Sequence, residues 1–118
     1  MVRKIISPTT IPVPGDKVIE EFIGRLRTET GDYSVAHMIA PAGWDEPFQL
    51  PKFDEITIVI NGVMRVETDG GVEDVAAGEV ILVTSGERIR YSNPFSERAE
   101  YWAICVPAFS PDLAQREE

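Results

Sequence analysis

The sequence predicts an all-β fold in a single domain, either a β-sandwich or a small barrel. Short runs rich in β-branched and aromatic residues recur at roughly 8–12-residue spacing, which is typical of such folds. Turn residues such as Asn61-Gly62 and Asp69-Gly70 separate these runs and are typical of hairpins. No window of about a dozen residues carries a convincing 3.6-residue apolar repeat of a helix, and residues 16–27 come nearest to one. The length of 118 residues fits one domain, residues 1–118, without a linker.

The expected strands follow one another along the chain. They cover about residues 18–29, 33–40, 55–60, 63–68, 72–76, 79–84, 88–92 and 99–106. Segment 16–27 is also a helix candidate, because Val18, Phe22 and Leu26 are four residues apart. Gly24 in its interior disfavours a helix, so we interpret the segment as a strand. The last segment, 108–118, ends in Arg-Glu-Glu and is expected to be a surface tail.

One expected strand, residues 56–60, is apolar on both faces. A strand of this kind needs a cover on each side of its sheet. One interpretation is a homodimer that forms through the sheet containing Ile56, Ile58 and Ile60. The other is a central strand covered by hairpins of the same chain, and the sequence favours neither.

Composition argues against several classes of partner. The chain has 20 acidic and 11 basic side chains, a formal net charge of −9, whereas nucleic acids and anionic membranes require a basic surface. Cys105 is the single cysteine, so no internal disulfide forms. No apolar run approaches the ~20 residues that span a bilayer. We therefore expect a soluble, cytoplasmic protein that binds neither nucleic acid nor membrane.

Several common catalytic centres are also excluded. His37 is the only histidine, which rules out a three-histidine metal site within one chain. No serine lies in a Gly-x-Ser-x-Gly turn, and the scattered glycines form no phosphate-binding loop. Cys105 lies in an apolar run, residues 102–106, and is predicted to be buried and inert.

The order of the turn residues contains two spaced motifs. The first is G-x5-Q-x-P-x3-E-x6-G, formed by Gly43, Gln49, Pro51, Glu55 and Gly62. The second is G-x5-T-x-G-x2-I-x3-N, formed by Gly78, Thr84, Gly86, Ile89 and Asn93. Together they resemble the cupin superfamily, whose metal-binding members have G-x5-H-x-H-x3-4-E-x6-G and G-x5-P-x-G-x2-H-x3-N. The resemblance covers about residues 33–107 and is closest to small single-domain bacterial cupins.

The departures from these motifs concern the metal ligands. Where the family has its three histidines, this chain has Gln49, Pro51 and Ile89, and only Glu55 of the four usual ligands is present. Proline and isoleucine side chains have no donor atom. The resemblance therefore implies a small jelly-roll β-barrel, usually dimeric, with no cofactor and without the dioxygenase or isomerase chemistry of the metal site.

The same resemblance implies that Glu55 points into the barrel. Because side chains alternate along a strand, Thr57 then points inward as well. Gln49 points into the cavity by its motif position, and so does Tyr91, two residues after Ile89. One interpretation is that Gln49, Glu55 and Tyr91 bind a small polar molecule, with Glu55 as the catalytic proton carrier. The plainer alternative is a Gln–Glu–Tyr network that satisfies its own hydrogen bonds and binds nothing.

His37 lies on the strand that leads into the first motif, between Val35 and Ile39, so it faces either the core or the cavity. We consider it as a ligand-binding residue, although a lone histidine on such a strand is more often structural. In the alternative, His37, Gln49 and Glu55 together form a weak site for a divalent metal.

The loop before the first motif contains further candidates. Trp44, with Phe48 and Phe53, is expected at the mouth of the barrel, either as a ligand-binding rim or as loop packing. The neighbouring carboxylates Asp45 and Glu46 are expected to be solvated.

Three functional hypotheses follow. The first is a dimeric, metal-independent cupin that binds a small polar metabolite, with acid/base chemistry at Glu55. The second is a metal-dependent enzyme that uses His37, Gln49 and Glu55. The third is a non-catalytic interaction module with a filled barrel, which acts through the sheet containing Ile56, Ile58 and Ile60. The sequence does not decide whether the protein is an enzyme.

Overall fold

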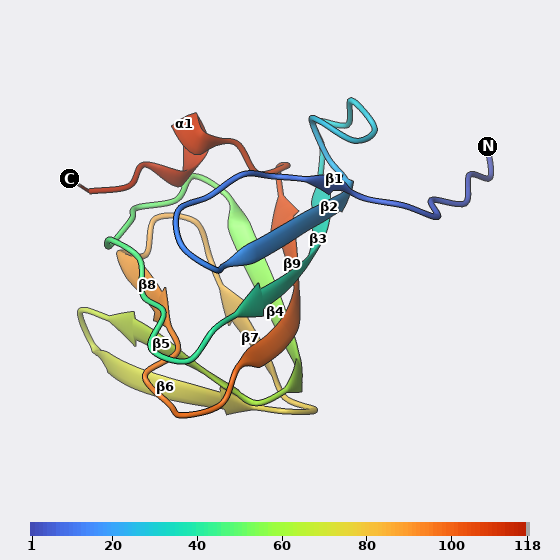
Figure 1. Ribbon diagram of the computed structural model, residues 1–118. Helices are drawn as coiled ribbons and strands as arrows, with labels where there is room; N and C mark the ends of the chain where they lie inside the picture. The colour runs from blue at the N-terminus through green and yellow to red at the C-terminus, as the bar shows by residue number, and fades with distance from the viewer. Residues whose placement is uncertain (118) are drawn as a thin grey trace.

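Two antiparallel β-sheets form the body of the protein (Figure 1). The computed structural model describes residues 1–117. Its elements are β1 (Thr9–Thr10), β2 (Val18–Ile23), β3 (Ser34–Ala40), β4 (Asp54–Asn61), β5 (Val63–Thr68), β6 (Gly71–Ala76), β7 (Val80–Val83), β8 (Ile89–Ser92), β9 (Ala99–Val106) and α1 (Pro111–Ala114). The strands form a six-stranded sheet in the order β1-β2-β3-β9-β4-β7 and a three-stranded sheet in the order β6-β5-β8. The all-β prediction is confirmed.

Each of the eight expected strands is present, but the first ends early. β2 stops at Ile23, six residues before the predicted end at residue 29. The chain turns there because Oε1 of Glu21 accepts hydrogen bonds from the backbone N–H groups of Leu26 and Arg27, each at 2.9 Å. Gly24 allows the close approach, since a Cβ atom there would lie 2.5 Å from Cδ of Glu21. The two-residue strand β1 was not predicted.

The two turns predicted as hairpins behave differently. Asp69-Gly70 does connect a hairpin, in which β5 and β6 pair from Thr68↔Gly71 onward. Asn61-Gly62 does not, because β4 belongs to the six-stranded sheet and β5 to the three-stranded sheet. The prediction of a hairpin at Asn61-Gly62 is therefore wrong. This turn is a corner at which the chain passes from one sheet to the other.

The core lies between the sheets, on their inward faces. It is a cluster of Ala40, Val59, Met64, Val66, Val75, Val83, Ile89, Tyr91, Ala99 and Tyr101. Asn93 of the second motif is fully buried beside it, and its side-chain amide donates to the carbonyls of Ala40 and Glu97 at 3.1 and 2.8 Å. The motif asparagine therefore holds the end of β8 against the segments that flank the core.

The C-terminal segment is more than the expected surface tail. Ala108 and Ala114 are fully buried. The backbone N–H of Lys52 donates to the carbonyl of Leu113 at 2.8 Å, so α1 and the residues after it lie along the loop that precedes β4. The expectation of a surface tail therefore holds only in part for residues 108–117: residues 111, 112 and 115–117 are exposed, but α1 packs at one end of the barrel (Figure 1).

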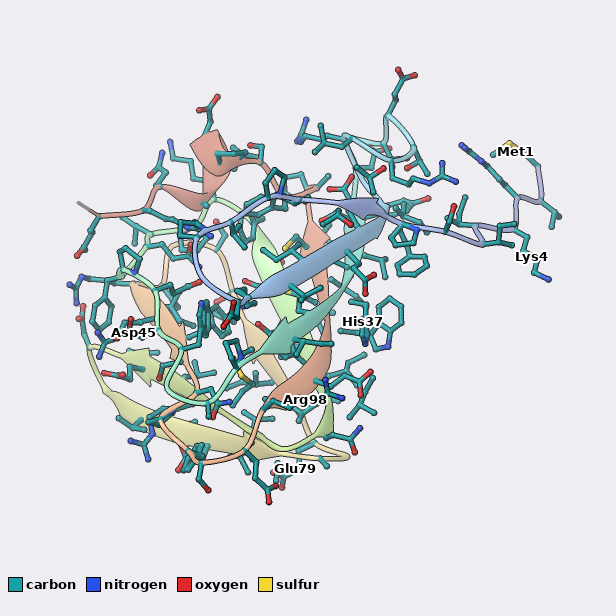
Figure 2. All side chains as sticks on the ribbon, in the orientation of Figure 1. Met1, Lys4, His37, Asp45, Glu79 and Arg98 are labelled. Carbon is teal, nitrogen blue, oxygen red and sulfur yellow. The ribbon has the colours of Figure 1, made fainter. Side chains whose placement is uncertain are left out.

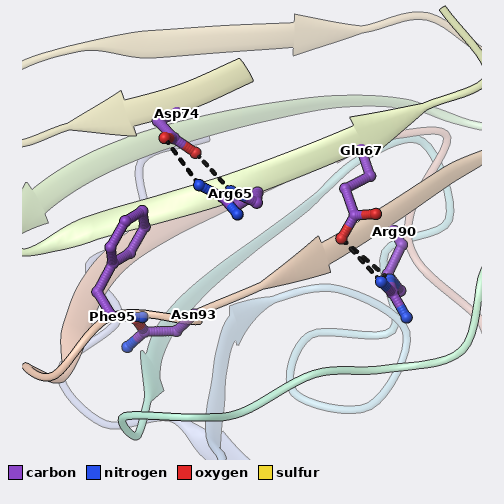
Figure 3. Close-up of polar contacts among 6 residues, drawn as sticks. All are labelled: Arg65, Glu67, Asp74, Arg90, Asn93 and Phe95. Atoms are coloured by element: carbon purple, nitrogen blue, oxygen red, sulfur yellow. Dashed lines mark hydrogen bonds and ion pairs between the residues drawn. The ribbon is translucent and has the colours of Figure 1, made fainter. Parts of the chain in front are cut away.

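The outer face of the three-stranded sheet is charged (Figure 3). Arg65 of β5 donates two hydrogen bonds to Asp74 of β6, at 2.9 and 3.2 Å. Arg90 of β8 donates two to Glu67 of β5, at 3.2 and 2.9 Å. Both pairs are directly opposite in the strand register. Exposed pairs of this kind stabilise the fold little, but they keep this face polar.

No helix within residues 1–117 is long and apolar enough to cross a membrane.

Candidate functional site

A cavity of about 340 Å³ opens on the inward face of the six-stranded sheet. Its wall combines side chains from β2, β3, β4, β8 and β9 with the loops before β2 and β4 and with Arg116 near the C-terminus. Most of the wall is apolar, with Ile19, Met38 and Phe53 among the lining side chains. A cavity with apolar walls and a few convergent polar groups is the usual form of a small-molecule site.

The fold brings Gln49, Glu55 and Tyr91 to this cavity, as predicted. Glu55 shares the inward face of β4 with the buried Thr57, because strand side chains alternate. Gln49 is fixed by two backbone hydrogen bonds with Ile89, each 2.9 Å long. Tyr91 follows two residues later on β8 and therefore points to the same side.

Three buried polar atoms at the cavity have no hydrogen bond of normal geometry within the described residues. They are Oε1 of Gln49, the hydroxyl of Tyr91 and Oε2 of Glu46. The hydroxyl of Thr57, farther along the inward face of β4, is also unpartnered. Buried polar atoms are almost always hydrogen-bonded in proteins, so these atoms indicate a bound molecule or ordered water. A network in which Gln49, Glu55 and Tyr91 satisfy one another would leave at least Oε1 of Gln49 without a partner.

Two carboxyl groups at the cavity, those of Glu46 and Glu55, hold protons more tightly than usual. Burial, together with the negative charge of Glu46, raises the pKa of Glu55 to about 7, although the nearby Tyr91 hydroxyl acts against this rise. Burial also raises the pKa of Glu46, although the positive charges of Lys17 and Arg116 act against it. Burial and the charge of Glu55 raise the pKa of the Tyr91 hydroxyl well above its usual value. At neutral pH, Glu55 is therefore present in both charge states and is suited to proton transfer.

Lys17 is a cavity residue that the sequence analysis missed. It directly precedes β2, and its Nζ donates a hydrogen bond to the hydroxyl of Tyr101 at 2.5 Å. The same Nζ lies 3.4 Å from the centroid of the Trp44 ring. Burial lowers the pKa of Lys17 to about 8, against the nearby charges of Glu46 and Glu55. The only local signal for an inward Lys17 was its position two residues before Ile19, because side chains two apart on a strand share a face and Ile19 faces the interior.

The loop that precedes β4 differs in part from the prediction. Trp44 lines the cavity, in agreement with the interpretation that it belongs to a ligand-binding rim. Glu46 was expected to be solvated, but it lines the cavity and its Oε2 is buried, so that expectation is corrected. The cause is tertiary: the backbone N–H of Asn93 donates to the carbonyl of Trp44 at 2.7 Å and draws the loop over the barrel.

His37 is not at the cavity. On β3 the buried Ala36 faces inward, so His37 points outward, as Figure 2 shows. Its Nδ1 lies 3.0 Å from Oε1 of Glu20, and its Nε2 lies 2.6 Å from Oε2 of Glu100. The pKa of His37 is raised overall. Partial burial acts to lower it, but the hydrogen bonds to Glu100 and Glu20 together have the larger effect. The expected grouping of His37 with Gln49 and Glu55 is therefore wrong.

The side chains present do not fit the metal site that the family motif implies. Of the four ligand positions only Glu55 offers a strong donor, because Gln49 is neutral and Pro51 and Ile89 have none. Within residues 1–117, no three His, Cys, Asp or Glu side chains are grouped as metal ligands.

Comparison with protein families decides the identity of the scaffold. The family model described as a cupin domain matches residues 36–107. This chain is a cupin. The small jelly-roll β-barrel expected from the two motifs is thereby confirmed.

Solved cupin structures share the fold across low sequence identity. A single-site variant of oxalate decarboxylase from Bacillus subtilis superposes with a TM-score of 0.80 at 18% identity, over 98% of this chain and 33% of that one. The polyketide cyclase RemF of Streptomyces resistomycificus gives 0.74 at 13% identity, over 90% and 80%. An RmlC-like cupin of Methanocaldococcus jannaschii gives 0.70 at 19% identity, over 91% and 93%. These likenesses establish the fold of the cupin and not its chemistry.

A curated relative is closer in sequence. The protein of Myxococcus xanthus named endoribonuclease YbeY is 47% identical over 107 residues. The match covers 91% of this cupin but 36% of that protein, so the cupin spans about a third of its relative's length.

Proposed function

We propose that this cupin binds a small molecule in the barrel cavity, one with an apolar body and a hydrogen-bonding head. The unpartnered polar atoms of Glu46, Gln49 and Tyr91 carry the proposal, because they converge on one cavity and need partners. The apolar wall suits the body of such a ligand. The net charge of −9 makes nucleic acid an unsuitable partner, so the ribonuclease name of the Myxococcus relative is not carried over.

In this proposal, Gln49 and Tyr91 orient the head of the ligand and Glu55 transfers protons to or from it. A carboxyl group with a pKa of about 7 has both the acid and the base form available near neutral pH. We propose chemistry without a metal ion, because the four motif positions supply only one strong metal ligand, Glu55, which is too few to hold a metal. The filled-barrel hypothesis is disfavoured by the cavity itself.

We also propose that two copies pair through the outer face of the six-stranded sheet. Six apolar side chains lie side by side there: Val80 and Leu82 of β7, Ile56 and Ile58 of β4, and Trp102 and Ile104 of β9. Val80 and Leu82 are 58% and 61% exposed, and no layer of the described chain covers Ile60, which is 39% exposed. A second copy fits these six side chains because an apolar contact between two chains of net charge −9 brings no like charges together, whereas the outer face of the other sheet carries charged pairs.

Tyr91→Phe tests the ligand site most sharply. The Tyr91 hydroxyl has no hydrogen bond of normal geometry within the described residues and interacts only weakly with the Glu55 carboxyl, so its removal should change the Tm little. Binding of benzyl alcohol, measured by saturation-transfer NMR, should weaken about three- to tenfold, the worth of one hydrogen bond. Binding of toluene, which has the same body without the hydroxyl, should be unaffected.

Two controls accompany this experiment. Glu73→Gln changes an exposed residue of β6 and should leave the binding of both probes unchanged. Dialysis against EDTA should also have no effect, and a loss of binding that zinc restores would reject the metal-independent site. If neither benzyl alcohol nor toluene binds the wild-type protein, the ligand cavity is rejected.

A further inference from the structure

Lys17 is a buried amine at the cavity. The chain has three lysines, and Lys4 and Lys52 are exposed, whereas Lys17 is 9% exposed. Lys17 lines the cavity together with Ile19 and Glu21, which follow it on β2. Burying an ammonium group is costly unless it is paired, so its surroundings need an explanation.

The contacts of this amine are aromatic rather than ionic. Nζ donates to the hydroxyl of Tyr101 at 2.5 Å and lies over the ring of Trp44 at 3.4 Å. Within residues 1–117 it forms no ion pair with a carboxylate within 4.0 Å. An ammonium group has three N–H donors, and one is used here, so the group can interact with a molecule in the cavity.

This environment raises the share of the neutral amine, although the ammonium form still predominates near pH 7. Burial lowers the pKa of Lys17 from 10.5 to about 8, which gives roughly 300-fold more neutral amine near pH 7 than an ordinary lysine has. The neutral form is the nucleophile, and lysines are activated in this way when they are desolvated.

A proton carrier lines the same cavity. Glu55 and Tyr91 both face it, and the charge of Glu55 is close enough to act on the pKa of Lys17. Condensation of an amine with a carbonyl group requires a proton to be supplied to the departing oxygen and another to be taken from the nitrogen. A carboxyl group that is half-protonated near neutral pH serves both steps.

We propose that Lys17 forms an imine with a small aldehyde or ketone bound in the cavity. This inference rests on the proposed ligand cavity and names the class of its ligand as a carbonyl compound. In the first step the nitrogen lone pair forms a C–N bond, the carbonyl π electrons move to oxygen, and one proton passes from the nitrogen to that oxygen. In the second step Glu55 gives a proton to the hydroxyl group, the C–O bond breaks and water leaves, and the nitrogen returns its remaining proton to Glu55 as the C=N bond forms. The sum is R₂C=O + H₂N–Lys17 → R₂C=N–Lys17 + H₂O.

Reductive trapping with benzaldehyde tests this proposal. Sodium cyanoborohydride adds hydride to the imine carbon and leaves one benzyl group on the amine, which peptide mapping by mass spectrometry assigns to a residue. Near pH 7, Lys17 should carry at least about tenfold more label than Lys4 or Lys52. Benzyl alcohol, which has no carbonyl group, should protect Lys17 and not the exposed amines. The Lys17→Arg variant keeps the positive charge but should lose the label at this position. The Lys52→Arg variant should still carry the label on Lys17.

The outcomes separate the two proposals. Preferential labelling of Lys17 with protection by benzyl alcohol supports the imine. Equal, unprotected labelling of all three lysines overturns it, and Lys17 is then a structural cation. If benzyl alcohol binds but Lys17 takes no label, the imine is overturned and the ligand cavity stands. If neither benzyl alcohol nor toluene binds the wild-type protein, both proposals fail. This measurement uses only the wild-type protein, so it does not depend on whether a variant folds.

Discussion

Glu55 is one of the residues through which pH acts on the cavity. Its pKa is raised from 4.5 to about 7, first by burial and then by the charge of Glu46. The folded protein therefore binds this proton more tightly than the unfolded chain does. By linkage, the free energy of unfolding falls as the pH rises from about 4.5 to about 7, because the folded state must then hold an unfavourable charge.

Glu55→Gln should remove this penalty. At about pH 8 the variant should be more stable than the wild type, by up to about 3 kcal/mol, because the amide keeps the shape of the acid without its charge. At about pH 4 the two proteins should unfold at the same urea concentration, since Glu55 is protonated in both states. Urea unfolding followed at several pH values measures the difference. Glu73→Gln on the surface should follow the wild-type curve, and identical curves for all three proteins would contradict the shifted pKa.

Strands and turns differ in how far neighbouring residues specify them. Once the cupin resemblance had placed Glu55 inward, alternation along β4 correctly placed Thr57 on the same face, because that face of the strand is buried. At the end of β4 the same local information misled, since Asn61-Gly62 is a corner between sheets rather than a hairpin. Gly62 has a φ of +79°, and a Cβ atom there would lie 2.5 Å from the backbone oxygen of Arg98. The glycine is therefore required by a contact distant in sequence.

Gly62→Ala should be more destabilising than Gly43→Ala. Both glycines have nearly the same positive φ, +79° and +80°, but a Cβ atom at Gly43 would meet nothing within 4 Å. Gly43→Ala should cost about 1–2 kcal/mol from the backbone alone. Gly62→Ala should cost about 1–3 kcal/mol more, because the backbone at Arg98 must move. Thermal and urea denaturation measure both values, and equal losses would show that the corner is not tightly packed.

The two outer faces of the barrel have opposite character. The three-stranded sheet carries the cross-strand pairs Arg65–Asp74 and Arg90–Glu67 (Figure 3). The six-stranded sheet presents apolar side chains from β7, β4 and β9 at matched register positions. Exposed apolar patches of this kind mark interfaces. The strand that is apolar on both faces is thus not covered by hairpins of its own chain, which leaves the homodimer as the interpretation that we propose.

Ile58→Asp should break the proposed dimer. Sedimentation velocity should give a dimer for the wild type and a monomer for the variant, because a charge at the centre of an apolar interface would be buried without a partner. Val72→Asp is the matched control, since Val72 is 55% exposed on β6 of the other sheet and should leave the dimer intact. A wild-type protein that sediments as a monomer would reject the interface.

The sequence by itself determined the all-β class and the order of the strands along the chain, because these depend on neighbouring residues through turn chemistry and the two-residue period of a strand. Its resemblance to the cupin motifs implied the inward direction of Glu55 and identified the motif positions that lack histidine. The tertiary structure alone decided that His37 faces outward between Glu20 and Glu100, and that Lys17 meets Tyr101, which is 84 residues away. It also decided that Glu46 and the C-terminal segment close over the cavity. Such meetings depend on strand register and on the path of loops between sheets, which local patterns do not encode.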